Sequence, residues 1–198
     1  NYMIDLDHAV IVDVEATTAI RQAEVTAAKR MIERSRERFG LYPARMTADS
    51  SYGSASMLAW LVHDQGIEPH IPVFDKSARR DGTLERNAFR YDHAGDVYIC
   101  PEGKVLSTTG ALVNEGATLA YLASTHDCRP CPLKLQCCPK TLMRQVTRSI
   151  HEGAHDMARD ILATPEGKAS RRQRKKVEML FAHLKRVAGR RILPECGL

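Results

Sequence analysis

The sequence predicts an α/β fold, in which helices flank a sheet, and three observations support this prediction. Segments with strand-like and helix-like patterns alternate over residues 1–74. A basic amphipathic helix is expected near the C-terminus, over about residues 165–189. Between these two parts the composition differs, with changes at about residue 75 and again at about residue 165. Alternating strands and helices of this kind form α/β sheets with right-handed crossovers.

The first expected element is a hairpin. Tyr2 to Val14 is rich in Ile and Val, which alternate imperfectly with polar residues, and Asp5, Asp7 and His8 in its middle indicate a turn. A helix is expected from about Ile20 to Phe39, because apolar residues recur along one side, charged residues cover the other, and a glycine follows.

A second strand and helix place an aspartate at a strand end. The strand is expected at Ala44 to Ala48, and Asp49 follows it directly. A polar turn then leads into a helix at Ala55 to Asp64 and a strand at Ile67 to Val73, where two prolines favour an edge position. Because open α/β sheets place their sites at the carboxyl ends of strands, Asp49 is a candidate site residue.

The two composition changes divide the chain. Residues 1–74 are the N-terminal part of the core, residues 75–165 are a Cys-rich insertion, and residues 166–198 are the basic helix that completes the core. In the insertion, FRYDHAGDVYIC and KVLSTTG have the pattern of short strands, so we expect a small β-rich core there.

The basic segment carries more than the whole net charge of the chain. Residues 168–191 hold ten Lys or Arg residues and a single acid, Glu178, so this segment is +9 in a chain of +5. Its apolar residues recur at helical spacing, which predicts a helix that packs on a core. The cations that we expect to contact a DNA backbone are Arg171, Arg172, Arg174, Lys175, Lys176, Lys185 and Arg186.

Glu178 has two interpretations. It lies beside the apolar stripe, next to Val177, so a carboxylate at the rim of the buried face suits a metal site with phosphates nearby. Alternatively it is an ordinary helix glutamate that pairs with Arg174 or Lys185 and contributes a few tenths of a kcal/mol, about 0.2–0.5.

The cysteines predict a structural zinc site. Cys128 and Cys131 form a C-x2-C pair with flanking prolines, Cys100 precedes them, and Cys137 follows, with Cys138 as an alternative fourth ligand. Four thiolates suit a tetrahedral zinc ion. The alternative is a set of buried or incidental thiols, and Cys196 lies outside the set.

One motif suggests a metalloprotease, and we reject it. His151, Glu152 and His155 spell H-E-x-x-H, but Gly153 interrupts the helix that this motif requires, and no third ligand follows at short spacing. We expect a surface segment there.

No apolar run is long enough to span a bilayer and the first residues do not resemble a signal peptide, so we expect a soluble, cytoplasmic protein. The chain starts within a strand-like pattern and without a methionine, so we expect that sequence upstream is missing.

Several blocks of the sequence resemble a known family. In order they are AVIVDVEAT, TADSSYGSASMLAWL, YICPEGKVL, CRPCPLKLQC and TPEGKASRRQRKKVEMLFAHLKR. They resemble the catalytic region of bacterial insertion-sequence transposases of the DDE type, in the group with a Cys-rich insertion. The resemblance covers nearly the whole chain.

The resemblance implies an RNase H-like fold, a mixed five-stranded sheet flanked by helices, with three carboxylates that hold two Mg²⁺ (or Mn²⁺) ions. By motif, Asp49 is the second carboxylate and Glu178 the third. The first aspartate is expected upstream of this chain, with Asp5, Asp7 and Asp13 as poor substitutes. A further departure is Ser51, where the family commonly has glycine.

The predicted function is therefore hydrolysis and strand transfer at transposon ends by two-metal chemistry. Double-stranded DNA is the expected partner, and a homo-oligomer is possible. Because the first acid is expected upstream, we expect this chain alone to be inactive. The rival hypothesis is a non-catalytic, zinc-stabilised DNA-binding remnant of a transposase.

Overall fold

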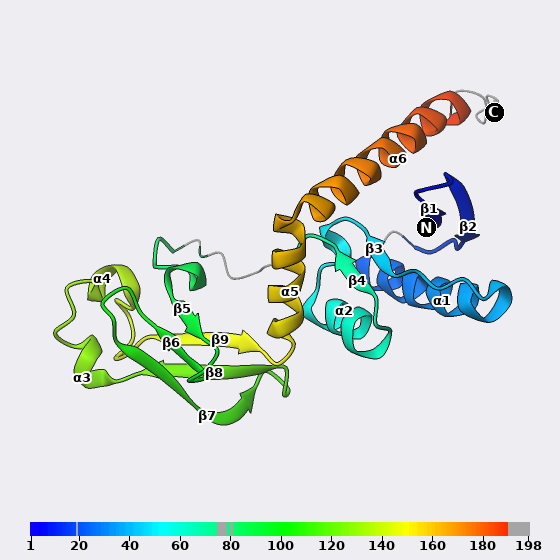
Figure 1. The fold of residues 1–198 in the computed structure, drawn as a ribbon. Helices are drawn as coiled ribbons and strands as arrows, with labels where there is room; N and C mark the ends of the chain where they lie inside the picture. The colour runs from blue at the N-terminus through cyan, green and yellow to red at the C-terminus, as the bar shows by residue number, and fades with distance from the viewer. Residues whose placement is uncertain (19, 75–78, 80, 190–198) are drawn as a thin grey trace, which may run out of the picture. The chain divides into compact units, whose positions relative to one another are not determined.

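The computed structural model describes residues 1–18, 20–74, 79 and 81–189 (Figure 1). The chain divides into two compact units. The first unit contains Asn1–Phe74 together with the chain from Ala154 onward, and the second contains Asp75–Gly153. Each unit is described by itself.

The first unit begins with the predicted hairpin. Strands β1 (Tyr2–Asp5) and β2 (Val10–Val14) pair antiparallel. Helix α1 (Arg21–Phe39) follows and ends at Gly40, whose φ of 63° is the left-handed conformation that glycine adopts readily. Two ion pairs join β2 and the residue after it to α1, from Arg34 to Asp13 at 2.7 Å and from Arg34 to Glu15 at 3.1 Å.

The second predicted strand pair also forms. Strand β3 (Arg45–Thr47) pairs parallel with β4 (Glu68–His70). Between them lie the 3-10 turn η1 (Ser50–Tyr52), helix α2 (Ala55–Ala59) and the π-helical turn η2 (Trp60–Asp64). This β3–α2–β4 order is the predicted strand, helix, strand unit, and a parallel pair requires such a crossover.

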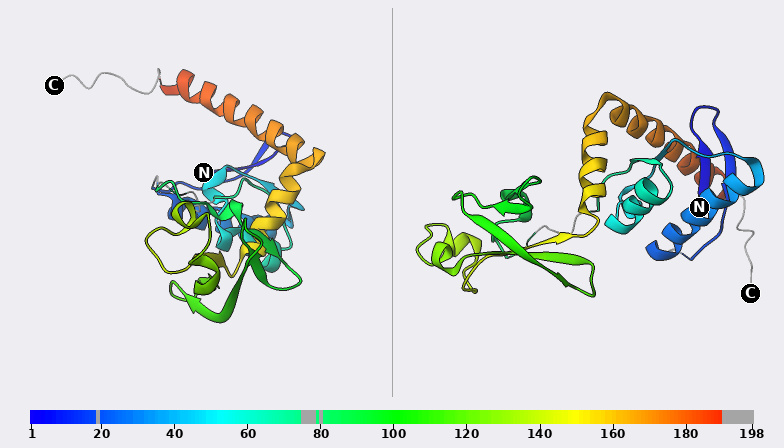
Figure 2. Two further views of the ribbon diagram at one scale, coloured as in Figure 1. Left: turned by 90° about the vertical axis from the view of Figure 1, so that its left-hand side faces the viewer. Right: turned by 60° about the horizontal axis from the view of Figure 1, so that its bottom comes forward.

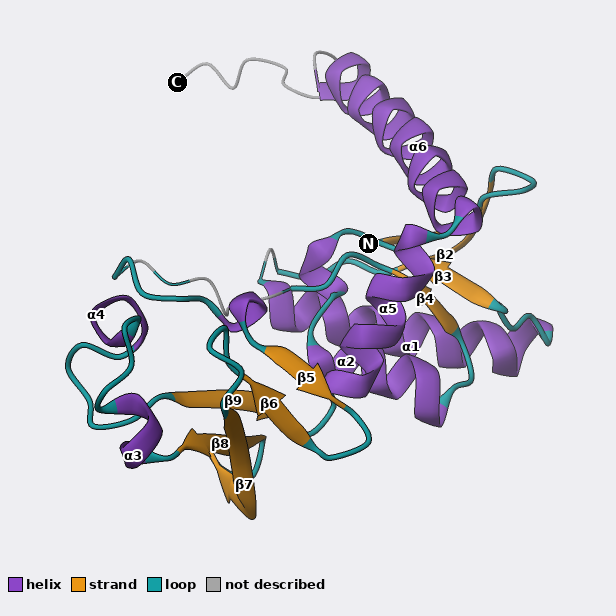
Figure 3. Ribbon diagram, turned by 60° about the vertical axis from the view of Figure 1, so that its left-hand side comes forward, coloured by secondary structure: helices purple, strands orange, loops and turns teal. Residues whose placement is uncertain are grey.

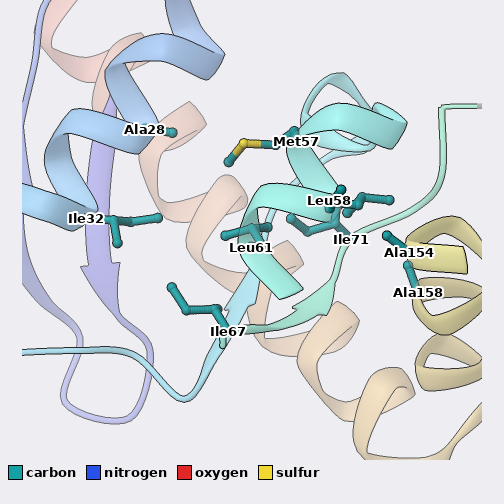
Figure 4. Close-up of a cluster of buried hydrophobic side chains, with 10 residues drawn as sticks. Ala28, Ile32, Met57, Leu58, Leu61, Ile67, Ile71, Ala154 and Ala158 are labelled. Atoms are coloured by element: carbon teal, nitrogen blue, oxygen red, sulfur yellow. The ribbon is translucent and has the colours of Figure 1, made fainter. Parts of the chain in front are cut away.

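Helices α1, α2 and α5 (Glu152–Ala163) supply most of the core of the first unit. Figure 4 shows Met57 and Leu61 on the side of Ala28 and Ile32 of α1, and Leu58 beside Ile71 on the side of α5. Ala154 and Ala158 close the cluster from α5, which explains why the chain from Ala154 onward belongs with the first unit.

Helix α6 (Pro165–Gly189) is the predicted basic helix and is drawn as the long helix in Figure 1. The hydroxyl of Thr164 accepts a hydrogen bond from the Gly167 N–H at 3.0 Å, which caps its first turn. A Cβ on Gly167 would lie 2.2 Å from the Ile161 carbonyl oxygen, so only glycine allows α5 and α6 to approach this closely.

The mixed five-stranded sheet implied by the family resemblance is not seen. The described strands of the first unit form two separate two-stranded sheets, β1–β2 and β3–β4. The α/β character is confirmed, but an RNase H-like sheet is not.

The second unit contains a curled antiparallel sheet in the order β5 (Arg90–Asp92), β6 (Val97–Ile99), β7 (Val105–Val113), β8 (Thr118–Ala123) and β9 (Gln145–Ser149). A 3-10 turn, η3 (Arg86–Ala88), precedes it, and helices α3 (Thr125–Cys128) and α4 (Lys134–Cys137) lie between β8 and β9. Figures 2 and 3 show the long β7–β8 pair and the two short helices at one end of the sheet.

Side chains from the two edge strands of this sheet meet. The Arg148 guanidinium lies 3.8 Å from the centroid of the Tyr91 ring, which joins β9 to β5. Tyr91 and Tyr121 both donate to Asp96 Oδ1 at 2.6 Å. These contacts explain the curl, because a flat five-stranded sheet would hold its outer strands far apart.

Candidate active site

A cavity of about 850 Å³ lies within the first unit, between the hairpin, β3, α1 and α6. Its walls are mainly apolar and include Met3, Ile32 and Met46. Four carboxylates also line it, Asp5, Asp7, Asp49 and Glu178. The two acids predicted from motifs therefore face one cavity although 129 positions separate them in the sequence.

Asp49 is held by the turn that follows β3. It caps η1, and its Oδ1 accepts the Ser51 N–H at 2.7 Å. Ser51 has no positive φ, so the serine that stands where the family commonly has glycine is accommodated without backbone strain.

Gly53 fixes this turn against the residues after β4. A Cβ at position 53 would lie 1.9 Å from the Pro72 carbonyl oxygen, and the Gly53 carbonyl accepts the Phe74 N–H at 2.8 Å. The glycine in the Ala48 to Ser54 block therefore allows the close approach that positions Asp49.

Glu178 projects from the cavity face of α6. Arg174, one turn earlier, lies on the same face, with Nη1 3.4 Å from Glu178 Oε1. This is the i, i+4 pair that the ordinary interpretation of Glu178 expected. Ser170, which is 3% exposed, and Val177 complete this face, and α6 lies beside β3 and β4.

Asp5, which we expected to be a poor substitute for the first acid, also lines this cavity. It ends β1 as Asp49 follows β3, and it lines the same cavity. Asp7 is more exposed and lies 3.8 Å from Arg45, while Asp13 does not line the cavity and pairs with Arg34. The position of Asp5 at the carboxyl end of the first expected strand was a signal available in the sequence.

Tyr52 adds a hydroxyl to the cavity wall. Burial, with smaller effects from the charges of Glu24 and Asp49, raises the pKa of Tyr52 to about 12. The phenol therefore stays protonated at neutral pH and can act as a hydrogen-bond donor.

The predicted DNA-binding cations lie along α6. The side chains of Arg171, Arg172, Lys175, Lys176 and Arg186 are exposed, and Arg174 is half-buried at the cavity. The side chain of Lys185 lies outside the described part of the structure. The exposed cations thus form a positive surface on the helix that also carries Glu178.

The predicted zinc ligands form no metal-binding group among the described residues. Cys128 and Cys137 are buried in the core of the second unit, whereas Cys100 and Cys131 are half-buried. Burial raises the pKa of the Cys128 thiol and raises that of Cys137 to about 11. Both side chains therefore favour the neutral thiol when no metal is bound.

No three His, Cys, Asp or Glu side chains in the described ranges are grouped closely enough to hold a metal ion. The structure therefore does not support the structural zinc site, including its alternative ligand Cys138, and Cys196 lies outside the described residues. The same finding applies to the carboxylates that line the cavity, which share its wall but are not gathered around one point.

The H-E-x-x-H segment is not the surface segment that we expected. His151 is exposed and precedes α5, but Glu152 and His155 are buried. Glu152 Oε1 pairs with Arg86 Nη2 at 3.0 Å, and this ion pair explains why the glutamate can be buried.

Comparison with protein families identifies the chain. The model of the transposase DDE domain matches residues 99–198, which is half of the sequence. The chain belongs to the transposase DDE domain family. No curated protein and no solved structure gave a significant match.

Family membership confirms the resemblance and the general function of a transposase. The matched range contains the cysteines and Glu178, whereas Asp5 and Asp49 precede it. DDE transposase domains use Mg²⁺ and bind DNA at transposon ends. In the described part of this DDE domain, no helix has the length and apolar character of a membrane span.

Proposed function

We propose that this DDE domain carries a complete set of three catalytic carboxylates, Asp5, Asp49 and Glu178, for hydrolysis and strand transfer at transposon ends. The observation that carries the proposal is the single cavity lined by all three. Asp5 then takes the place of the first aspartate that the sequence analysis expected upstream of the chain.

The positions of the strands support this assignment. β1 pairs only with β2 and β3 only with β4 among the described strands, yet both β1 and β3 line the cavity. Met3 of β1 and Met46 of β3 pack against the same core cluster. We propose that β1 and β3 pair when the cavity closes, which would give a mixed sheet in the order β2-β1-β3-β4, one strand short of the five of an RNase H-like sheet.

Such pairing would bring the acids together. Asp5 ends β1 and Asp49 follows β3, so parallel pairing would set the two carboxylates at one edge of the sheet. Glu178 would approach the same edge because α6 lies beside β3 and β4. Closure is needed because the acids are not grouped around one point in this structure.

The donor set fits Mg²⁺ in kind, since all three side chains are carboxylates and Mg²⁺ prefers oxygen ligands. When bound, two such ions activate water or a 3′-hydroxyl and stabilise the leaving oxygen of the scissile phosphate. The protein's part is to hold the three carboxylates and to keep the DNA backbone in place.

We propose that the exposed cations of α6 bind the phosphates of the duplex. Arg171, Arg172, Lys175 and Lys176 lie within two turns of one another and precede Glu178 by less than two turns. Arg174 lies between this surface and the cavity, and its Nη1 is ion-paired with Glu178 Oε1 at 3.4 Å.

The proposal predicts that the three acids are each required for cleavage. Nicking of supercoiled plasmid DNA in Mg²⁺ or Mn²⁺ is the measurement, with the variants Asp5→Asn, Asp49→Asn and Glu178→Gln. Each variant should lower the rate by about 100-fold or more, because groups that act as one unit fail when any one is removed.

Asp7→Asn is the matched control, since it removes the same charge from the same turn and Asp7 also lines the cavity. Its rate should stay within about threefold of the unaltered chain, the effect of a surface charge. If Asp7→Asn abolishes nicking and Asp5→Asn does not, Asp5 is not the first acid. If the unaltered chain neither nicks DNA nor binds Mn²⁺, the set of three acids in this chain is not a catalytic site.

A further inference from the structure

The cavity of the first unit runs along the edges of strands and not over one face of a sheet. Every residue of the runs 1–7 and 41–49 lines it, and these runs contain β1 and β3. Successive side chains of a strand point to opposite faces, so a cavity over one face would be lined by every second residue. The continuous lining therefore places the cavity beside an edge of each strand.

The edges that face the cavity carry unpaired main-chain groups. Among the described strands, β1 pairs only with β2 and β3 only with β4, so each keeps one edge without a partner strand. The paired edges are not the ones at the cavity, because β2 contributes only Val12 to the described lining and β4 contributes no residue. The unpaired edges of β1 and β3 thus offer N–H donors and carbonyl acceptors to one cavity.

Two hydroxyls in the cavity wall also lack partners. Ser35 of α1 is 1% exposed, and within the described residues neither its Oγ nor the buried Oγ1 of Thr47 in β3 has a hydrogen-bond partner. Both residues line the cavity beside apolar side chains that include Met3, Ile32 and Met46. Because buried polar groups are normally hydrogen-bonded, an occupant that brings polar groups into this apolar space would satisfy them.

The charged side chains of the lining favour a cation. In the described part of the chain they are Asp5, Asp7, Asp49, Glu178, Arg45 and Arg174. Arg174 pairs with Glu178 at 3.4 Å, and Arg45 lies 3.8 Å from Asp7. Asp5 ends β1 and Asp49 follows β3, so the excess of carboxylates lies at the ends of the two strands. An anionic occupant is therefore disfavoured there.

We propose that this cavity binds an extended apolar peptide of a partner protein, which adds as a strand between β1 and β3 and places a Lys or Arg at the acidic end. Addition of a strand to a free sheet edge is a recurring mode of peptide recognition, and here two edges are available. The run 1–7 suits a segment of about seven residues, at about 3.3 Å per residue. This inference goes beyond the proposed function, because binding does not require the acids to be catalytic.

The added strand and the proposed pairing of β1 with β3 exclude each other, since both use the same main-chain groups. A bound peptide therefore holds the cavity open. If the proposed function is also correct, the peptide inhibits nicking of DNA, because the three acids then stay apart. Binding itself is measured without DNA and without divalent cations.

The first test uses the whole chain and a fluorescein-labelled peptide of that length, in which valine alternates with threonine and the last residue is lysine. Fluorescence anisotropy in buffer with EDTA should show saturable one-to-one binding. Successive N–H groups of a strand point to opposite edges, so N-methylation of alternate residues removes the donors toward one neighbouring strand at a time. Each of the two N-methylated peptides should bind at least about tenfold more weakly, because several hydrogen bonds are lost.

The second test fills the cavity. Ser35→Leu adds a larger side chain in the wall and should weaken binding of the unmodified peptide by at least about tenfold. The matched control is Ser56→Leu, at an exposed serine of α2 that does not line the cavity, and its affinity should stay within about twofold. Circular dichroism checks that both variants fold, and the N-methylated peptides test the unaltered chain in any case.

Several outcomes would overturn the inference. They are the absence of saturable binding, equal affinities of the unmodified and N-methylated peptides, or a loss with only one of the two N-methylated peptides, which would mean pairing with a single edge. A folded Ser35→Leu variant that binds as tightly as Ser56→Leu would place the peptide elsewhere. An unchanged affinity when the lysine is replaced by glutamate would refute the acidic end. Failure of the proposed function is separate, because it is measured by nicking without peptide.

Discussion

Neutralising the exposed cations of α6 should lower both the affinity of the chain for duplex DNA and the salt dependence of that affinity. The variant replaces Arg171, Arg172, Lys175 and Lys176 by alanine, which reduces the formal net charge of the chain from +5 to +1. All four side chains are exposed on the helix that carries Glu178. They are therefore available to phosphates close to the proposed site.

The expected magnitude follows from the number of phosphates that these cations can reach. Six consecutive helical positions span about 7.5 Å along the axis, so two to four of the side chains can contact phosphates of one duplex. Each contact contributes about 0.9 to the slope of log K against log salt, so the slope should fall by roughly 1.8 to 3.6. Raising the salt from about 50 to 200 mM lowers the affinity of both proteins. At the upper value, the fold-loss for the variant would be about 100 times smaller than the fold-loss for the unaltered chain.

Fluorescence anisotropy with a labelled duplex of arbitrary sequence, at four or more salt concentrations, measures both quantities. The matched control replaces the exposed Arg38, Arg90, Arg129 and Lys140 by alanine, which removes the same charge from other elements. Its slope should change by less than about 1, that is, by at most one contact. Equal slopes for the two variants would mean that DNA responds to net charge alone and that α6 is not the contact surface.

Two further predictions concern the structure around the sites. Gly53→Ala should destabilise the chain by about 1–3 kcal/mol in urea unfolding, because the new Cβ would lie 1.9 Å from the Pro72 carbonyl oxygen. The control Gly153→Ala in α5 adds a Cβ that meets open space, so it should be neutral or stabilising. Comparable stabilities for the two variants would contradict the packing at Gly53. The Cys137 thiol should react with iodoacetamide at pH 8 more slowly than the half-buried Cys131, and its rate should keep rising as the pH approaches its pKa of about 11, because only the thiolate reacts. Equal rates by mass spectrometry would show that burial does not protect Cys137.

The sequence predicted the local elements of the first unit well, because their signals are local. Alternating apolar residues predicted the hairpin, and a glycine predicted the end of α1. Thr164 and Pro165 indicated the start of α6. Asp49 and Glu178 were predicted as site residues because each lies in a distinctive block, and this assignment stays a prediction. The family model confirms the transposase assignment. Local hydrogen bonding and amphipathic pattern are encoded within a few residues, so they can be read without the fold.

Other features depended on which residues meet in space. Three aspartates near the N-terminus look equivalent in sequence, and only the structure shows that Asp5 lines the cavity that Asp49 and Glu178 also line. The C-x2-C pair predicted zinc, but spacing along the chain does not fix where thiols lie, and the described cysteines form no metal group. The burial of Glu152 and His155 could not be predicted from local sequence either, because it depends on residues distant in sequence, such as Arg86, which pairs with Glu152.

The sequence by itself determined that this chain is a DDE transposase domain with α/β character and a strongly basic helix beside one candidate acid. Only the tertiary structure decided that Asp5, Asp49 and Glu178 share a cavity. The physical reason is that patterns of one to four residues specify helices, strands and turns, whereas a site requires side chains from several elements to converge. That convergence is set by the packing of the core around Ile32, Leu61 and Ile71, and no single segment contains it.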